Sequence, residues 1–382
     1  MEFNFWLKIF KRAIIFFILL VLSCASSLKF PQIDFEEKDS DWRSFRDDQS
    51  NLDGRDFDIT LPLKLLWRKK VGPSYSTPLI LDEMVVIGSL DQKIVFLGLN
   101  SGDKLGSYPL SFPLSITPCA DESVLYFTEG KGNSNLFALS LKSGALVWNK
   151  RLRGLSSSPI TIKVALFIGT EKGELLCLNK INGELLWKHK AGDFIYSTAV
   201  FSEEALYFGS GDRKIYSLDL SSGKLIWSYE TEGAIYASAC MDEKTLFLGS
   251  ADGYFYALES SSGELLWKFK TEGSIHSSAT RGKGMVFFGS NDGHLYALSS
   301  KDGELVWSFK TDGPIHSSPI MVGDKLFFGS LDRSFYGLNS LNGELVFQYE
   351  TGGMIYASPS FSGGRILFAS MDGYLYCLGE KE

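Results

Sequence analysis

Two histidines with matching surroundings are the first candidates for chemistry in this chain. His276 and His316 lie 40 residues apart, each followed by Ser-Ser. Imidazole side chains could ligate a metal ion or transfer a proton. Such a site also needs carboxylates or a nucleophile in register, and none of the four histidines has one. We therefore predict no catalytic residue, no cofactor-binding residue and no metal site.

The two histidines belong to a series with one member in each sequence repeat. The series runs Tyr75, Ser115, Ser156, Tyr196, Tyr236, His276, His316 and Tyr356. If the repeats surround an axis, these side chains line one mouth of the axial channel. Aromatic rings with polar tips could grip a peptide or small ligand there, whereas simple packing of the channel wall is the competing interpretation.

The elements that must position these side chains are revealed by tryptophan spacing. Trp148, Trp187, Trp227, Trp267 and Trp307 follow one another at intervals of 39, 40, 40 and 40 residues. The same spacing reaches Phe347 in one direction and Gly106 and Trp67 in the other. A fixed period of this length is typical of a solenoid, a propeller or an array. We therefore expect eight copies of one supersecondary unit.

Each unit divides into four strand-like segments separated by turn residues. In one unit these segments cover residues 225–231, 235–240, 245–249 and 254–259. Asp252-Gly253 and Ser262-Gly263 supply residues suited to tight turns. Both faces of the segment 254–258 are apolar, so the sheet must be sandwiched between neighbouring sheets. The pattern predicts an all-β fold, an eight-bladed propeller of four-stranded antiparallel blades.

The ends of the chain indicate how the ring closes. The last unit has only three strand-like segments, whereas residues 63–71 form an outer-strand motif with no inner strands before it. An N-terminal outer strand would complete the eighth blade and remove open sheet edges. Seven blades is the alternative, because the unit at Gly106 lacks its tryptophan and spans 42 residues to Trp148.

Composition limits the partners and the state of the cysteines. The net charge is −7 and Lys and Arg form no run beyond the first dozen residues, so we exclude nucleic acid as a partner. Cys119, Cys177, Cys240 and Cys377 could form two disulfides in an oxidising compartment. However, Cys177 and Cys377 stand where other repeats have Ala257 and Ala297, which favours buried free thiols.

The N-terminal region is typical of an exported protein. Lys8, Lys11 and Arg12 precede an apolar stretch at residues 13–22, which is too short to span a bilayer. The following Leu-Ser-Cys resembles a bacterial lipobox, with Cys24 as the lipidated residue; an ordinary cleaved signal or an uncleaved anchor is the alternative. We expect a signal peptide at 1–23, an acidic tether at 24–62 and the propeller at 63–382. Residues 41–47 (DWRSFRD) should pack over the first units.

The repeats resemble a known family. GSADGYFYALESSSGELLWKFKT and the lead-in DWRSFRDD are similar to the pyrroloquinoline-quinone-type propeller repeat and its N-terminal approach. One branch of the family, the quinoprotein dehydrogenases, implies a cofactor held by adjacent cysteines, a Trp floor and calcium. No two cysteines are adjacent here and no insertion could wall in a cofactor. We expect no cofactor and no enzyme activity.

The other branch consists of BamB lipoproteins of the outer-membrane β-barrel assembly machinery. Arg151, Leu152, Arg153, Gly154 and Leu155 resemble the loop by which that branch contacts its barrel-forming partner. An exposed Leu beside an Arg suits an interface, whereas solvated loop charges are the plainer interpretation. Asp193 lies one place from the acidic position of the family pattern, which puts that half of the interface in doubt.

The leading hypothesis is a lipid-anchored docking scaffold, a monomer within an envelope complex. The resemblance implies the outer membrane, the periplasmic side rather than the cell surface, and envelope proteins such as the barrel-forming assembly subunit as partners. A quinone-dependent dehydrogenase and a generic extracellular ligand-binding module are the alternatives. The sequence leaves open the partner's identity and any channel ligand.

Overall fold

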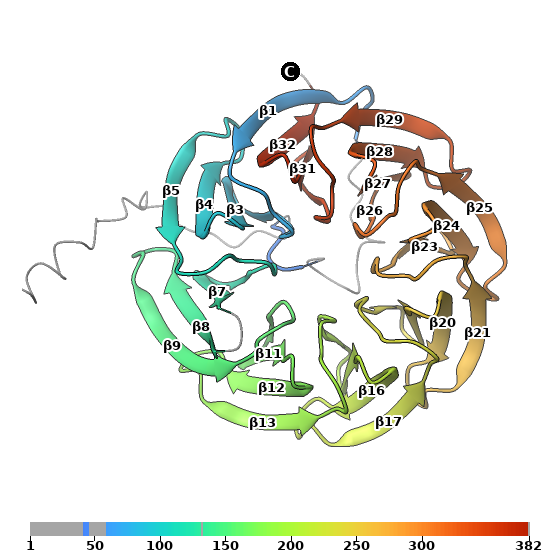
Figure 1. The fold of residues 1–382 in the computed structure, drawn as a ribbon, viewed down its shortest axis with the longest axis horizontal. Coiled ribbons are helices and arrows are strands. Elements are labelled where there is room, and N and C mark those ends of the chain that lie inside the picture. Colours follow the sequence, from blue (N-terminus) through green and yellow to red (C-terminus); the bar gives the residue numbers. More distant parts are fainter. Residues whose placement is uncertain (1–40, 46–58, 131–132, 381–382) are drawn as a thin grey trace, which may run out of the picture.

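Eight four-stranded sheets surround a central axis as the blades of a propeller (Figure 1). The computed structural model describes residues 41–45, 59–130 and 133–380. The expected signal peptide at 1–23, Cys24 and most of the expected tether lie outside these residues. Within the described ranges, no helix has the length and apolar character needed to cross a membrane. The predicted all-β, eight-bladed fold is confirmed.

Within each of the first four blades, strands follow one another from the axis outward, and every hydrogen-bonded pair is antiparallel. Blade 1 contains β2 (Leu79–Leu81), β3 (Met84–Ser89), β4 (Lys93–Gly98) and β5 (Lys104–Pro109); blade 2 contains β6 (Cys119–Asp121), β7 (Val124–Glu129), β8 (Asn133–Ser140) and β9 (Leu146–Arg153); blade 3 contains β10 (Ile160–Ile162), β11 (Ala165–Gly169), β12 (Glu174–Asn179) and β13 (Leu185–Lys190); blade 4 contains β14 (Val200–Phe201), β15 (Ala205–Gly209), β16 (Lys214–Asp219) and β17 (Leu225–Glu230).

The second half of the ring repeats this order. Blade 5 contains β18 (Cys240–Met241), β19 (Thr245–Gly249), β20 (Tyr254–Glu259) and β21 (Leu265–Lys270); blade 6 contains β22 (Thr280–Gly282), β23 (Met285–Gly289), β24 (His294–Ser299) and β25 (Leu305–Lys310); blade 7 contains β26 (Ile320–Val322), β27 (Lys325–Gly329), β28 (Ser334–Asn339) and β29 (Leu345–Glu350); blade 8 contains β30 (Ser360–Ser362), β31 (Arg365–Ala369), β32 (Tyr374–Gly379) and β1 (Lys64–Lys70).

The ring is closed by strands from the two ends of the propeller. β1 pairs antiparallel with β32, placing Lys64 opposite Gly379 and Trp67 opposite Cys377. In Figure 1, β1 completes the outer circle between β29 and β5. The predicted closure by an N-terminal outer strand is therefore confirmed, and the seven-bladed alternative is wrong.

Blades pack face to face through aromatic side chains, as the apolar character of both sheet faces predicts. Phe255 of β20 stacks on Phe288 of β23 in the next blade, with ring centroids 4.0 Å apart. Phe335 of β28 stacks in the same way on Phe368 of β31 at 3.9 Å. All four rings are fully buried, so these contacts contribute apolar burial and ring stacking at once.

The outer-strand tryptophans join neighbouring blades. The Trp267 indole N–H donates to the Ser300 carbonyl of the following blade at 3.2 Å. The same ring covers Gly303, where a Cβ atom would come within 2.4 Å of the indole. Gly303 also has φ = 74°, a conformation that favours glycine. Turn geometry and the approaching indole therefore both require glycine at this position.

The missing tryptophan of blade 1 is explained by an exchange across a strand pair. In blade 5 the small Ala257 lies opposite the large Trp267, whereas in blade 1 the large Phe96 lies opposite Gly106. Phe96 is buried, so it supplies aromatic volume from the neighbouring strand. The blade keeps its place in the ring without the tryptophan.

The cysteines in the described part of the chain are unpaired. Cys119, Cys177, Cys240 and Cys377 are all free and buried, as expected. Burial raises the pKa of the Cys177 and Cys377 thiols to about 12, so both are protonated at neutral pH. They act as small core side chains.

The segment Asp41–Phe45 packs at the axis against blades 1 and 2, as the sequence predicts. Trp42 forms an isolated antiparallel bridge with Ile80 of β2 and is 1% exposed. The Arg43 carbonyl accepts a hydrogen bond from Ala120 of β6 at 2.7 Å. Ile59 is also fully buried, so packed structure begins before residue 63.

Candidate functional site

Six aromatic side chains form an arc around one mouth of the axial channel. Successive ring centroids lie 6.1 Å apart for Tyr196–Tyr236, 4.9 Å for Tyr236–His276, 5.1 Å for His276–His316, 5.6 Å for His316–Tyr356 and 5.2 Å for Tyr356–Tyr75. Each ring comes from the loop that enters a different blade. Because these loops repeat, one position per repeat builds a continuous aromatic surface.

The arc is open on the side of blades 2 and 3, where the equivalent positions are Ser115 and Ser156. The Ser156 hydroxyl donates to the Ile195 carbonyl at 2.8 Å and so belongs to the wall. Beside the opening, Phe194 lies 4.5 Å from Tyr196 and 5.4 Å from Tyr236, measured between ring centroids. Phe194 therefore widens the aromatic surface at that end.

A belt of hydroxyl side chains lies two residues further along each inner loop. The backbone N–H of one blade donates to the hydroxyl of the next, at 2.9 Å between Ser238 and Ser278. Equivalent bonds join Thr77 to Thr117, Thr117 to Ser158, Thr198 to Ser238, Ser278 to Ser318 and Ser318 to Ser358. The belt satisfies buried backbone donors and also lines the channel with polar oxygen atoms.

Arc and belt enclose a cavity of about 190 Å³. Phe45 contributes to its lining. Because the neighbouring Arg43 bonds to β6 beyond Thr117 and the arc, Phe45 reaches the cavity from the side opposite the arc. The cavity is therefore a pocket that faces the aromatic mouth, with a neutral lining of hydroxyls and rings.

The two histidines of the arc are neutral at physiological pH. Burial, and secondarily the charge of His276, lower the pKa of His316 to about 4. Burial also lowers the pKa of His276. Within residues 41–45, 59–130 and 133–380, no three His, Cys, Asp or Glu side chains are grouped to hold a metal ion. The arc offers hydrogen bonding and ring faces rather than charge.

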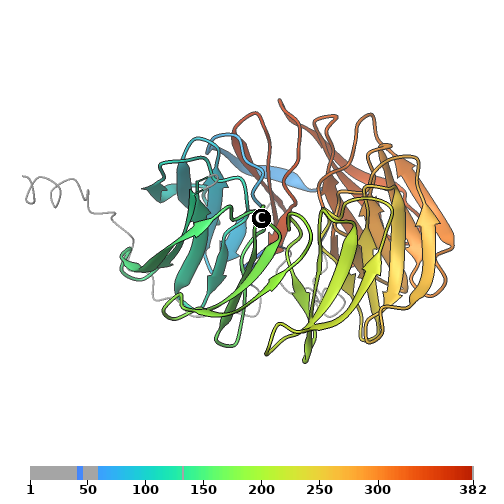
Figure 2. The same cartoon turned by 60° about the horizontal axis from the view of Figure 1, so that its bottom comes forward.

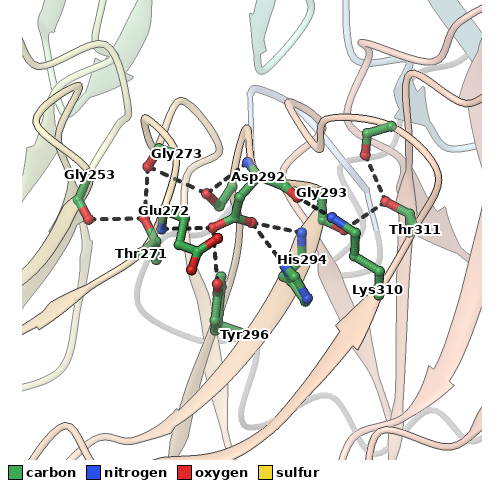
Figure 3. A network of polar contacts seen from close by, with 12 residues as sticks. Gly253, Thr271, Glu272, Gly273, Asp292, Gly293, His294, Tyr296, Lys310 and Thr311 are labelled. Atoms are coloured by element: carbon green, nitrogen blue, oxygen red, sulfur yellow. Dashed lines mark hydrogen bonds and ion pairs between the residues drawn. The ribbon is translucent and has the colours of Figure 1, made fainter.

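The aspartates that recur in blades 4 to 8 are engaged in hydrogen bonds between blades. Asp292 accepts from the Tyr296 hydroxyl at 2.9 Å and from the Glu272 N–H at 3.1 Å (Figure 3). Its second oxygen accepts from the His294 N–H at 2.9 Å. Burial alone would raise the pKa of Asp292, but these bonds lower it overall. Both carboxylate oxygens are thus occupied.

The same arrangement recurs around the ring. A tyrosine four residues later donates to the carboxylate in the pairs Tyr216–Asp212, Tyr256–Asp252, Tyr296–Asp292, Tyr336–Asp332 and Tyr376–Asp372. The sequence assigns these aspartates to turns alone. Their bonds to residues 20 positions earlier could not be found from turn patterns, although the constant Asp-x-x-x-Tyr spacing was a signal.

The candidate partner-binding loop differs from the expectation in one respect. Arg151 and Arg153 are exposed at the end of β9, but Leu152 is half-buried and Leu155 is 7% exposed. The expected exposed leucine is therefore absent. Leu155 occupies the position of Ile235 in its own repeat, where an apolar side chain fills the blade junction.

Gly154 and Asp193 complete the set of sequence-predicted contact residues. Gly154 is buried with φ = 62° and its carbonyl accepts from Glu171 N–H at 2.6 Å. Asp193 is exposed in the next inner loop, close enough to Tyr196 to contribute, after burial and Glu171, to raising that tyrosine's pKa. The structure thus presents two arginines and one aspartate from this set to solvent.

Comparison with protein families gives two partial matches. Residues 132–241 match the family described as outer membrane protein assembly factor BamB, and residues 198–382 match the β-propeller of the β-alanine-activating enzyme. Quinoprotein alcohol dehydrogenase PedH of Pseudomonas putida is 28% identical over 131 residues, covering 29% of this chain. The chain spans about a fifth of that relative's length, 22%.

Solved structures share the architecture. BamB from Moraxella catarrhalis superposes with a TM-score of 0.72 at 17% identity, covering 84% of this chain and all of that one. Quinohemoprotein alcohol dehydrogenase from Comamonas testosteroni gives 0.75 at 14% identity, covering 90% of this chain and 81% of that one. Together with the family matches, these confirm the predicted resemblance to the pyrroloquinoline-quinone-type repeat family.

Proposed function

We propose that this propeller of pyrroloquinoline-quinone-type repeats is a non-enzymatic docking scaffold for outer-membrane β-barrel assembly. The observation that carries the proposal is the engagement of its recurring polar side chains. Asp252, for example, accepts bonds from Tyr256, Glu232 N–H and Tyr254 N–H, at 2.8, 3.0 and 2.7 Å. These carboxylates hold blades together and are not oriented toward a reacting group.

The surface left for recognition lies on the mouth face. Tyr75, Tyr196 and Tyr236 are 41%, 42% and 36% exposed, respectively. Arg151 and Arg153 are exposed in the strand that leads into the neighbouring loop. Tyrosine and arginine are the residue types enriched at protein interfaces, because they combine apolar area with directed hydrogen bonds. The match to the BamB family includes this loop and Asp193.

The membrane attachment in this proposal rests on the N-terminal sequence. Lipidation at Cys24 after removal of residues 1–23 would place the propeller on the periplasmic face of the outer membrane. The acidic segment that follows would act as the tether. Intact-mass analysis of the mature protein checks this step: the mass must correspond to a chain that begins at a lipidated Cys24, and Cys24→Ala must release the protein from membranes.

A quinone-dependent dehydrogenase is the second candidate, favoured by the partial match to PedH. The two functions predict different results for purified protein. Addition of pyrroloquinoline quinone and calcium should produce no dye-linked oxidation of alcohols or sugars if the chain is a scaffold. Turnover that depends on the quinone would overturn the scaffold proposal.

Docking is tested by capture from outer-membrane extracts. The double variant Arg151→Glu/Arg153→Glu should recover less of the barrel-forming assembly subunit than the unmodified chain. Lys224→Glu/Lys301→Glu is the matched control, because it makes the same charge change at exposed turns on the opposite face. Equal loss in both variants would indicate a general charge effect, and full capture by the arginine variant would show that this loop is not the contact.

A further inference from the structure

The junction between blades 3 and 4 contains a cavity of about 640 Å³ on the face opposite the aromatic mouth. Its walls come from the β10–β11 hairpin, β12 and β13 of blade 3, and from the two turns of blade 4 that follow β14 and β16. Figure 2 shows turns projecting from both faces of the ring. A concave site of this volume lies within the range of small-molecule pockets.

The tryptophan at this junction differs from its equivalents. Indole N–H groups of Trp67, Trp148, Trp227, Trp267 and Trp307 donate to carbonyls of Leu99, Lys180, Ser260, Ser300 and Ser340 in the next blade. The corresponding acceptor for Trp187 is Leu220, but no such bond forms in the described part of the chain. Both Trp187 and Leu220 line the cavity. One donor and one acceptor that are joined elsewhere are therefore separated here.

The interior of the cavity is apolar. Phe167, Cys177, Leu186 and Trp187 contribute from blade 3, and the rings of Phe167 and Trp187 lie 5.6 Å apart. Burial raises the pKa of Cys177 to about 12, which keeps this wall uncharged. An aromatic or branched hydrocarbon group would replace water on these surfaces favourably.

The rim is acidic. Glu203, Glu204 and Asp219 line the cavity from blade 4, whereas Lys163 is its single cation. Hydrogen bonds from Ser222 and Ser221 lower the pKa of Asp219 to about 2, so it is ionised at neutral pH. The rim therefore carries three negative charges against one positive charge, which favours a cation.

We propose that this groove, defined by Phe167, Trp187, Leu220, Glu203, Glu204 and Asp219, binds a small aromatic amine. The hydrocarbon part packs on Phe167 and Trp187, and the ammonium group faces the blade 4 carboxylates. The Leu220 carbonyl is an additional acceptor for the ammonium, and the Trp187 ring offers a face to the cation. This site lies on the other face of the ring from the proposed docking surface and is independent of it.

Binding is measured by NMR on the full chain with ¹⁵N-labelled indoles. Trp187→Phe assigns the Trp187 indole resonance, and Trp227 is the internal control because its N–H donates to Ser260 at 3.0 Å. Tryptamine is the probe, and indole-3-propionate is the matched anion with the same ring. Tryptamine should shift the Trp187 resonance, leave Trp227 unchanged, and bind at least about tenfold more tightly than the anion.

The charge of the rim is tested separately. Glu203→Gln/Glu204→Gln changes two exposed side chains, so the fold should persist while tryptamine affinity falls by about fivefold or more. Increasing salt should reduce the affinity of the unmodified chain in the same direction. No Trp187 shift at about 5 mM tryptamine, equal shifts of Trp187 and Trp227, or equal affinity for the anion would each overturn the proposal.

Discussion

The carboxylate of Asp252 accepts a hydrogen bond from the backbone N–H of Glu232 at 3.0 Å. Glu232 follows the outer strand of blade 4, whereas Asp252 lies in the turn between β19 and β20 of blade 5. The bond thus connects the rim of one blade to the interior of the next. Five aspartates form such bonds, to residues 192, 232, 272, 312 and 352.

Asp252→Ala should destabilise the propeller by about 1–3 kcal/mol, because three donors lose a charged acceptor at once. Urea unfolding followed by circular dichroism measures the change. Tyr256→Phe removes only one of the three bonds and should cost less, about 1 kcal/mol. If Asp252→Ala is no more destabilising than Tyr256→Phe, the bond between blades contributes nothing measurable.

Trp267→Phe should destabilise the protein more than Trp187→Phe. Both changes remove similar apolar area, but only Trp267 loses a hydrogen bond, the one to Ser300 at 3.2 Å. The expected difference in unfolding free energy is about 1 kcal/mol. Equal losses from denaturant titrations would contradict the structural distinction between the two junctions.

Trp42→Ala should destabilise the folded chain by about 3–5 kcal/mol, as expected for truncating a fully buried indole. The side chain packs with core residues of blades 1 and 8, including Ile80 and Ile366. Phe112→Ala is the control, because that ring is 53% exposed and its loss should change stability little. Similar unfolding midpoints for Trp42→Ala and the parent chain would show that residues 41–45 do not dock in solution.

The pH dependence of stability should contain a contribution from His316. Its pKa is about 4 in the folded protein, below the ordinary value of 6.5, so the unfolded chain binds more protons between these values. This contribution is fully present above pH 6.5, decreases as the pH falls and is lost by about pH 4. Unfolding free energies should therefore fall more steeply between pH 6.5 and 4 for the parent than for His316→Phe. Parallel curves would contradict the lowered pKa.

Much of the fold follows from the repeat alone. The tryptophan interval set the number of blades, and the unpaired outer-strand motif before Tyr75 indicated closure by an N-terminal strand. The weakness of the unit at Gly106 could not be interpreted from sequence, because Phe96 compensates from the neighbouring strand. That exchange depends on cross-strand register, which a linear comparison does not contain.

The candidate sites were less accessible. One position per repeat was enough to bring Tyr75 and His276 to the same mouth in the structure. Burial of Leu155 was missed because the resemblance to a contact loop outweighed its repeat position. The groove beside Trp187 could not be inferred at all, since it depends on the distance between two blades. Its sequence contains the same tryptophan as its neighbours.

The pairing of β1 with β32 also has a consequence for biosynthesis. Residues 64–70 are made early, but their hydrogen-bond partners at 374–379 are among the last to be added. Until then the nascent chain is an open crescent with an unsatisfied strand at each end. Completion of the ring must therefore follow completion of the polypeptide. A chain truncated before residue 374 would retain two sticky edges, making it a substrate for chaperones or proteases rather than a smaller propeller.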